Sequence, residues 1–285
     1  MSLTRLVAHL RAGGVNEFFV VGSTGEAPLL DESDRLAIIE TVRGAAPDGT
    51  IYAGVSGTGH RHAIRNARDA ARAGADIAVV MSPFFVALDQ PQLVDFSTAI
   101  ADASPLPLAL YHHLRMPTPF TVPTVARLAV HANIVALKDT NGGDHNRCAE
   151  ILAATAGTPL KFFQGVEKLV LPTLAAGGHG CVVAQGNIAP HLFRAVLDAW
   201  QAGDTARAED WQRQIDALWG IFLRPEVRQS FAHFLLTMKR PLQQRGVIAT
   251  TAGALPGVIF APAFEQLIDD FMAQHLPSLP AVRMP

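Results

Sequence analysis

Seven short apolar segments rich in Val, Ile and Phe recur along the first two thirds of the chain, at intervals of roughly 25 to 30 residues. Each is followed by Gly, Ser or Thr and then by a stretch rich in Ala, Leu and Arg. This alternation is typical of repeated βα units and predicts a parallel sheet with helices on its faces. The expected strands are residues 17–23, 50–56, 77–83, 107–113, 134–140, 161–167 and 180–186.

The alternation ends after Asn187, and the rest of the chain has the spacing of amphipathic helices. We therefore expect two parts, a βα body over residues 1–190 and a C-terminal helical extension over residues 191–285. The expected helices of the extension are residues 191–203, 204–222, 225–240 and 263–276.

Two α/β architectures fit such a body, a (β/α)8 TIM barrel and an open doubly wound sheet. A G-x-G-x-x-G fingerprint after the first strand would favour the open sheet, and the sequence GSTGEA at residues 22–27 lacks that spacing. We therefore predict the barrel. A closed barrel needs eight strands, whereas the sequence opens with a helical pattern over residues 3–15. Either the first strand is missing from the sequence or another segment takes its place.

The composition argues against several classes of partner. The net charge of -2 offers no broad basic surface for nucleic acid. No apolar run reaches the roughly 18 residues of a transmembrane helix, and the first residues lack the apolar core of a signal peptide. Cys148 and Cys181 are expected to be reduced thiols. We expect a cytoplasmic protein with no nucleic-acid or membrane partner.

Lys138 stands at the end of an expected strand, where barrel enzymes place their active-site residues. If its side chain points inward, Ala136 and Ile134 lie beneath it, while the intervening residues and Asp139 face the helices. Apolar walls favour the neutral amine, which can attack a carbonyl carbon and form a Schiff base. A lysine that simply reaches solvent gives the same pattern, so the spacing alone leaves both interpretations open.

Tyr111 ends the preceding expected strand in the matching position, where a phenol can act as general acid and base. Ser23, Thr24 and Gly25 follow the first expected strand, and their hydroxyls and N–H groups could cradle a carboxylate. Both features also occur without function, since a tyrosine can lie at the barrel rim and a turn can simply join a strand to a helix.

Four stretches in this order resemble the dihydrodipicolinate synthase and N-acetylneuraminate lyase family. They are GSTGEAPLLDESDR from residue 22, YHH from residue 111, ALKDTNGG from residue 136 and QGVEKLVLPTLAAGGHGCVVAQGNIAP from residue 164. The resemblance spans residues 12 to roughly 190. It implies a βα barrel, a homotetramer, and no metal or organic cofactor.

The resemblance also implies roles for individual residues. Lys138 matches the lysine that forms an imine with the 2-oxo carbon of pyruvate or a longer 2-oxo acid. Tyr111 matches the tyrosine that transfers protons, and Ser23 and Thr24 match the hydroxyl pair that helps to bind the carboxylate and relay protons.

Three positions depart from the family pattern. Phe85 takes the place of a tyrosine that both enzymes borrow from a neighbouring subunit. The arginine that holds a substrate carboxylate in the synthases is displaced to Arg115 or absent, which counts against lysine biosynthesis. Lys168 replaces the second acid of the lyases, so the sialic-acid pocket is not intact.

We therefore expect a Schiff-base lyase or aldolase that acts on another 2-oxo acid, such as a deoxy sugar acid. Glu167 and His113 are expected to line the distal end of the substrate site, because Glu167 is the acid that is kept and His113 shares the strand parity of Tyr111. Gly165 is expected to be a further substrate-binding residue. The alternatives are a 2-oxo-acid dehydratase or a dihydrodipicolinate synthase-type condensation on the same lysine.

Two further alternatives lie outside this chemistry. The protein could be a catalytically weak relative that binds a 2-oxo acid as a sensor or transport component. A metal-dependent hydrolase is suggested by the histidines but disfavoured, because metal ligands must converge with a carboxylate and a second shell. The histidines in question are His60, His62, His112 and His113.

Overall fold

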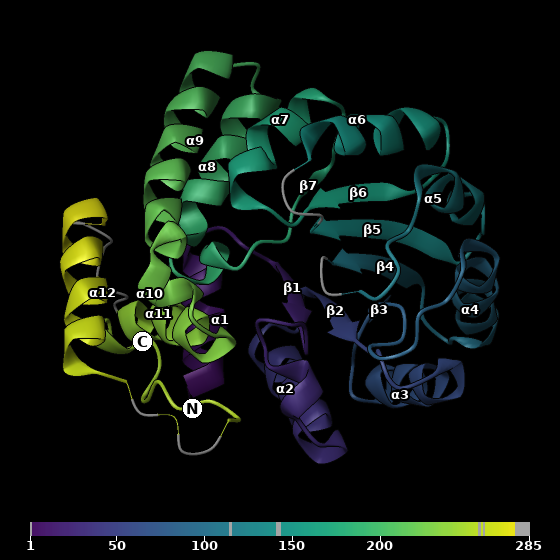
Figure 1. Cartoon of the computed structure of the whole chain (residues 1–285), viewed down its shortest axis with the longest axis horizontal. Helices are drawn as coiled ribbons and strands as arrows, with labels where there is room; N and C mark the ends of the chain where they lie inside the picture. The colour runs from purple at the N-terminus through teal and green to yellow at the C-terminus, as the bar shows by residue number, and fades with distance from the viewer. Residues whose placement is uncertain (1, 114–115, 141–143, 256–257, 259, 277–285) are drawn as a thin grey trace.

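A single curled sheet of parallel strands, joined in chain order from β1 to β7, dominates the first part of the molecule (Figure 1). The computed structural model describes residues 2–113, 116–140, 144–255, 258 and 260–276. Within those residues all seven expected strands are present. They are β1 Glu17–Val20, β2 Thr50–Gly54, β3 Ile77–Val80, β4 Leu108–His113, β5 Ile134–Thr140, β6 Lys161–Gln164 and β7 Gly180–Cys181.

Helices follow the strands and cover the outer face of the sheet (Figure 1). Their starts follow from the sequence: Asp31 and Asp89 each accept a hydrogen bond from a first-turn N–H, and Gln92 completes a capping box with Asp89. The helices of the body are α1 Ser2–Ala12, α2 Glu32–Ala45, α3 His60–Arg72, α4 Gln90–Ala103, α5 Val122–Ala129, α6 His145–Ala154 and α7 Val170–Ala175, with the short 3-10 helices η1 Ala27–Leu29, η2 Glu167–Leu169 and η3 Gln185–Asn187.

The helices of the last third pack beside the open side of the sheet (Figure 1). Their apolar core includes Ile215, Ile221 and Ile268 and also takes in Val170 and Ile188 from the end of the body. The division into residues 1–190 and 191–285 stays a prediction. These helices are α8 Pro190–Gln201, α9 Thr205–Trp219, η4 Gly220–Leu223, α10 Pro225–Arg228, α11 Phe231–Gln244 and α12 Pro262–His275.

The sheet does not close on itself among the described residues, because β1 pairs only with β2 and β7 pairs only with β6. A cavity of about 510 Å³ lies between the two edge strands. It is lined by residues of both strands and of α1, α8 and α11, such as Phe18, Cys181, Val7, Phe193 and Leu235. The structure thus supplies seven strands of an eight-stranded barrel, and the cavity lies where the remaining strand would stand.

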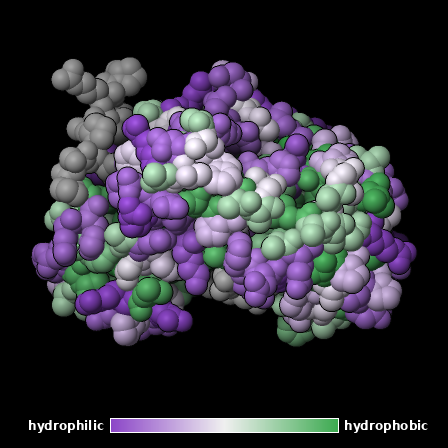
Figure 2. Space-filling model, turned by 90° about the horizontal axis from the view of Figure 1, so that it is seen from above, coloured by the Kyte–Doolittle hydropathy of each residue, from purple (hydrophilic) through white to green (hydrophobic). Residues whose placement is uncertain are grey.

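The sheet separates two apolar clusters. Val79, Ala109, Tyr111 and Ala136 form the cluster inside the curl, and the much larger outer cluster lies between the strands and their helices. Over the face shown in Figure 2, hydrophilic side chains are interspersed with smaller hydrophobic patches. No helix within the described ranges is long and apolar enough to cross a membrane.

A bulge at the start of β5 corrects one expectation. Leu108 pairs with Ile134, but the next residue of β4 pairs with Ala136, so Val135 is an extra residue in the ladder. A bulge shifts the alternation of side chains by one position. Ile134 therefore packs in the outer cluster, and the prediction that it lies beneath Lys138 was wrong. Ala136 does lie in the inner cluster.

Candidate active site at the ends of β1, β4 and β5

Lys138 and Tyr111 are direct partners in the β4–β5 ladder. The Nζ atom of Lys138 lies 4.3 Å from the centroid of the Tyr111 ring and 4.9 Å from that of Phe19. The half-buried amine thus has aromatic rings beside it, and it also borders the cavity between β1 and β7. A small carbonyl compound in that cavity can approach the amine, which is the first requirement of imine formation.

The turn after β1 lies close to Lys138 and Tyr111. Ser23 Oγ and Tyr111 Oη lie 3.0 Å apart and share a hydrogen bond. Thr24 and Gly25 line the same cavity as Lys138. The sequence-predicted lysine, tyrosine and hydroxyl turn, far apart in the chain, are therefore brought together at one end of the sheet.

The residues that flank the Ser23–Gly25 turn have positive φ angles, which are uncommon outside glycine. Val21 and Glu26 adopt left-handed conformations, with φ of 54° and 58°. Such a conformation in a residue other than glycine costs of order 1 kcal/mol or more and persists only where the surroundings enforce it. At Glu26 the enforcing contacts come from the C-terminal part of the chain.

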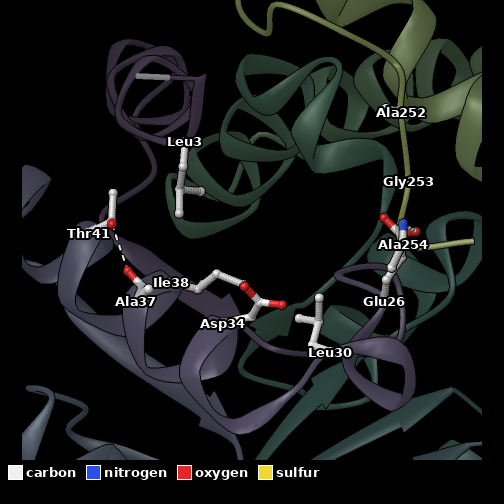
Figure 3. Close-up of a pocket in the computed structure, with 10 residues that line it drawn as sticks. All are labelled: Leu3, Glu26, Leu30, Asp34, Ala37, Ile38, Thr41, Ala252, Gly253 and Ala254. Atoms are coloured by element: carbon white, nitrogen blue, oxygen red, sulfur yellow. Dashed lines mark hydrogen bonds between the residues drawn. The ribbon is translucent and has the colours of Figure 1, made fainter.

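Those contacts are made by the buried Glu26 carboxylate, which sequence reasoning missed. It accepts hydrogen bonds from Lys239 Nζ at 2.6 Å and from the N–H of Ala254 at 2.8 Å. Figure 3 shows Glu26 beside Gly253 and Ala254 at the edge of a second cavity, of about 400 Å³. Lys138 does not line that cavity, but Leu3, Glu26 and Ile38 line both cavities, so the second cavity adjoins the one that Lys138 borders.

Aromatic side chains that were not predicted as site residues also line the space around Lys138. Phe19 contacts Tyr111 edge to face at 5.7 Å, and Phe163 is the ladder partner of Lys138 on β6. Tyr52 lies beside Phe163, and burial raises the pKa of its phenol to about 12. Alternation along β1 and β6 could have identified Phe19 and Phe163 as inward-facing.

Glu167 is 3% exposed, and its carboxylate is held by the protein itself. Its Oε1 accepts hydrogen bonds from the N–H groups of Ala184 and Gln185, at 3.1 and 3.2 Å. Burial raises the pKa of Glu167 above its ordinary value, while the backbone donors and the charge of Lys138 act in the opposite direction. The predicted contact of Glu167 with substrate stays a prediction.

Gly165 also has a structural reason for its place. A Cβ there would collide with Thr140 Oγ1, and its N–H donates to the carbonyl of Asp139 at 2.7 Å. His113 lies on the same side of β4 as Tyr111, with the two rings edge to face at 5.6 Å. The role of Gly165 in binding substrate and that of His113 in lining the distal end of the site stay predictions.

Of the three positions that depart from the family pattern, two are exposed and the third is not described by the structure. Phe85 follows β3 and is 95% exposed, and Lys168 is exposed as well. Arg115 lies outside the described residues. In the part of the chain that the structure describes, no three His, Cys, Asp or Glu side chains are grouped so that they could hold a metal ion.

Comparison with known protein families matches residues 1–260 to the group described as "Dihydrodipicolinate synthetase family". Among similar proteins, the 4-hydroxy-tetrahydrodipicolinate synthase 1 of Streptomyces coelicolor is 38% identical over 216 residues, which cover 74% of this chain and 68% of that protein. The 4-hydroxy-tetrahydrodipicolinate synthase of Acidiphilium cryptum is 36% identical over 211 residues, covering 73% of this chain and 71% of that protein.

Solved structures agree in fold. The chloride-inhibited dihydrodipicolinate synthase of Acinetobacter baumannii, in complex with pyruvate, is 27% identical with a TM-score of 0.86, covering 96% of this chain and 91% of that one. The E. coli prophage protein YagE, also in complex with pyruvate, is 24% identical with a TM-score of 0.88 and the same coverage, a likeness of fold alone. These similarities confirm the predicted barrel-type fold with C-terminal helices.

Proposed function

The chain belongs to the dihydrodipicolinate synthetase family, and on this premise we propose that Lys138 forms the Schiff base through which it acts on a 2-oxo acid. Membership confirms the predicted class, a Schiff-base enzyme of the pyruvate aldolase type. The observation that carries the proposal for Lys138 is its place opposite Tyr111, which in turn bonds Ser23.

In the proposed first step, the neutral amine of Lys138 attacks the 2-oxo carbon of the acid. The carbinolamine that results loses water and becomes an imine. Protons must leave the amine and reach the departing oxygen, and the Tyr111 phenol with the Ser23 hydroxyl provides a path for them.

In the second step the protonated imine draws electrons from the neighbouring carbon. Loss of a proton from that carbon gives an enamine, which can add to an aldehyde and form a carbon–carbon bond. Run in reverse, the same steps cleave such a bond. The Ser23–Gly25 turn lines the cavity beside Lys138, where its hydroxyls and N–H groups can hold the carboxylate of the acid.

We propose pyruvate as one product or reactant and a lyase or aldolase reaction on a longer 2-oxo acid, such as a deoxy sugar acid. The second candidate is condensation of the dihydrodipicolinate synthase type, which the names of the relatives favour. A dehydratase on the same lysine and a weakly catalytic 2-oxo-acid-binding protein are the remaining alternatives. Phe85 and Lys168 support a substrate other than that of the synthases or sialic-acid lyases, because neither supplies the group found there in those enzymes.

We further propose a cytoplasmic homotetramer that needs no metal or organic cofactor. Phe84, Phe85 and Val86 form a short apolar segment exposed after β3, and exposed apolar patches commonly mark contacts between subunits. Sedimentation equilibrium would test the tetramer.

Exchange of the methyl protons of pyruvate in D2O, followed by NMR, tests the enamine directly. We expect exchange with the parent protein and none with Lys138→Ala, whatever the natural second substrate is. Once exchange is established, a panel of aldehydes and longer 2-oxo acids distinguishes condensation from cleavage. Exchange that continues in Lys138→Ala would contradict the proposal.

A further inference from the structure

A buried polar pair lies on the outer face of the sheet, directly behind the candidate site. His112 Nδ1 and Asp139 Oδ1 are 2.6 Å apart, and both side chains are 1% exposed. The pair is not part of the proposed chemistry, because both residues point away from the interior that holds Lys138. At this distance the ring N–H donates to the carboxylate, a short charge-assisted bond.

The pair shares its backbone with the candidate site. Tyr111 pairs with Lys138 in the β4–β5 ladder, and the next pair along the same ladder is His112 with Asp139. Since successive side chains of a strand point to opposite faces, the inner pair and the outer pair are separated by one peptide unit on each strand. A bond that fixes the outer pair therefore also fixes the spacing of the inner pair.

The Asp139 end of the pair is itself held by a chain of buried polar contacts. Cys148 Sγ on α6 lies 3.7 Å from Asp139 Oδ2, and Gln164 Nε2 on β6 lies 3.4 Å from Cys148 Sγ. The same Gln164 nitrogen donates to Thr173 Oγ1 on α7 at 2.7 Å. The contacts thus link β4, β5 and β6 to two covering helices.

The His112 end is held by packing and by a cation. Its ring lies against Phe120, and Arg147 Nη2 is 3.4 Å from Nδ1 while donating to the carbonyl of Phe120. His112 Nε2 has no hydrogen-bond partner among the described residues, so Nδ1 alone fixes the direction of the ring. Within the described part of the chain, His112 therefore has no hydrogen-bonded route for protons to the interior.

We propose that the His112–Asp139 pair is a positioning element, which holds the ends of β4 and β5 so that Tyr111 and Lys138 keep the spacing their chemistry needs. The inference rests on the proposed function of Lys138 and Tyr111. A well-packed apolar pair would fill the same layer without the cost of burying a charge. The directional bond adds what an apolar pair lacks, a fixed alignment of the two strands.

The decisive variant is His112→Phe, which keeps a ring against Phe120 and removes the donor to Asp139. His112→Asn is the conservative comparison, because its amide N–H can still donate to Asp139. The chain also offers a matched control in the exposed pair of His131 Nε2 and Asp102 Oδ1, at 3.0 Å, which lies before β5 at the other end of the strand. Asp102→Ala breaks a His–Asp bond without touching the site.

The measurement is the rate of pyruvate proton exchange, with the concentration for half-maximal rate determined in parallel. A displacement of about 1 Å can slow a reaction about a hundredfold, so we expect His112→Phe to lower the maximal rate about ten- to hundredfold. The half-saturating pyruvate concentration should change little, because the Ser23–Gly25 turn, which we propose holds the carboxylate, follows β1 and not β4 or β5. His112→Asn should recover most of the rate, and Asp102→Ala should match the parent.

A His112→Phe variant with the parental melting temperature and the parental rate would overturn the inference, as would equal losses in His112→Phe and His112→Asn. If His112→Phe does not fold, the double variant His112→Phe/Asp139→Leu decides, because it leaves no buried charge unpaired. The inference requires this double variant to lose rate as well, and a folded double variant with the parental rate would overturn it. Absence of exchange in the parent protein would count against the proposed function instead, so the two failures are distinguishable.

Discussion

The hydroxyls of Ser23 and Tyr111 share a hydrogen bond of 3.0 Å although 88 residues separate them in the chain. The bond joins the turn after β1 to Tyr111 near the end of β4, and Tyr111 is the ladder partner of Lys138. Because a proton can pass between two such hydroxyls, their contact supports the proposed role of Tyr111 and Ser23 in proton transfer at Lys138.

Tyr111→Phe should slow pyruvate proton exchange by about a hundredfold or more, since general acid–base catalysis contributes about 10²–10⁴ to such rates. Ser23→Ala should slow it less, because the phenol remains. The loss of this part-buried hydrogen bond in either variant should lower the free energy of unfolding by only about 1 kcal/mol. NMR exchange rates and urea denaturation of the same samples give both quantities, and an unchanged rate in Tyr111→Phe would contradict the assigned role.

The order of elements could be predicted from the sequence, because it depends on local alternation, whereas the spacing alone left the direction of Lys138 open. The bulge at Val135 could not, since a bulge is a property of two paired strands and leaves no signal in one of them. For the same reason the sequence gives no hint that Glu26 bonds Lys239, which lies 213 residues further along. Roles in binding substrate, such as that of Glu167, stay predictions because they depend on a molecule outside the chain.

The buried carboxylate of Glu167 should make stability depend on pH in a definite direction. Burial raises its pKa in the folded protein above the ordinary 4.5, so the folded state holds this proton more tightly than the unfolded chain. The contribution of Glu167 to stability therefore falls as pH rises from 4.5 through the raised pKa, and stays low above it.

Glu167→Gln removes this titration and keeps an oxygen that can accept from Ala184 and Gln185. Relative to the parent, the variant should gain free energy of unfolding as pH is raised from about 4 to about 8. Urea denaturation at several pH values measures the difference. The exposed Glu40→Gln serves as control, and a parallel pH dependence of parent and Glu167→Gln would count against the burial effect.

Gly165→Ala should destabilise the protein, because the added methyl group meets Thr140 and the backbone of Asp139. Overpacking of this kind typically costs about 1–3 kcal/mol. The control is Gly44→Ala in α2, where a Cβ has nothing within 4 Å and where alanine should stabilise by about 0.5–1 kcal/mol. Thermal melting of both variants measures the effect. A Gly165→Ala protein as stable as the parent would contradict the prediction, because it would show that Thr140 and Asp139 move to accommodate the methyl group at no cost.

The formation of an imine on Lys138 is the central claim, and reduction with borohydride in the presence of pyruvate tests it most directly. The chain has only three other lysines, Lys161, Lys168 and Lys239, so mass spectrometry of proteolytic peptides can assign the label to one of them or to Lys138. We predict one reduced pyruvate per chain, on the peptide that carries Lys138, and no label in Lys138→Ala. A label on another lysine, or none in the folded parent protein, would contradict the account.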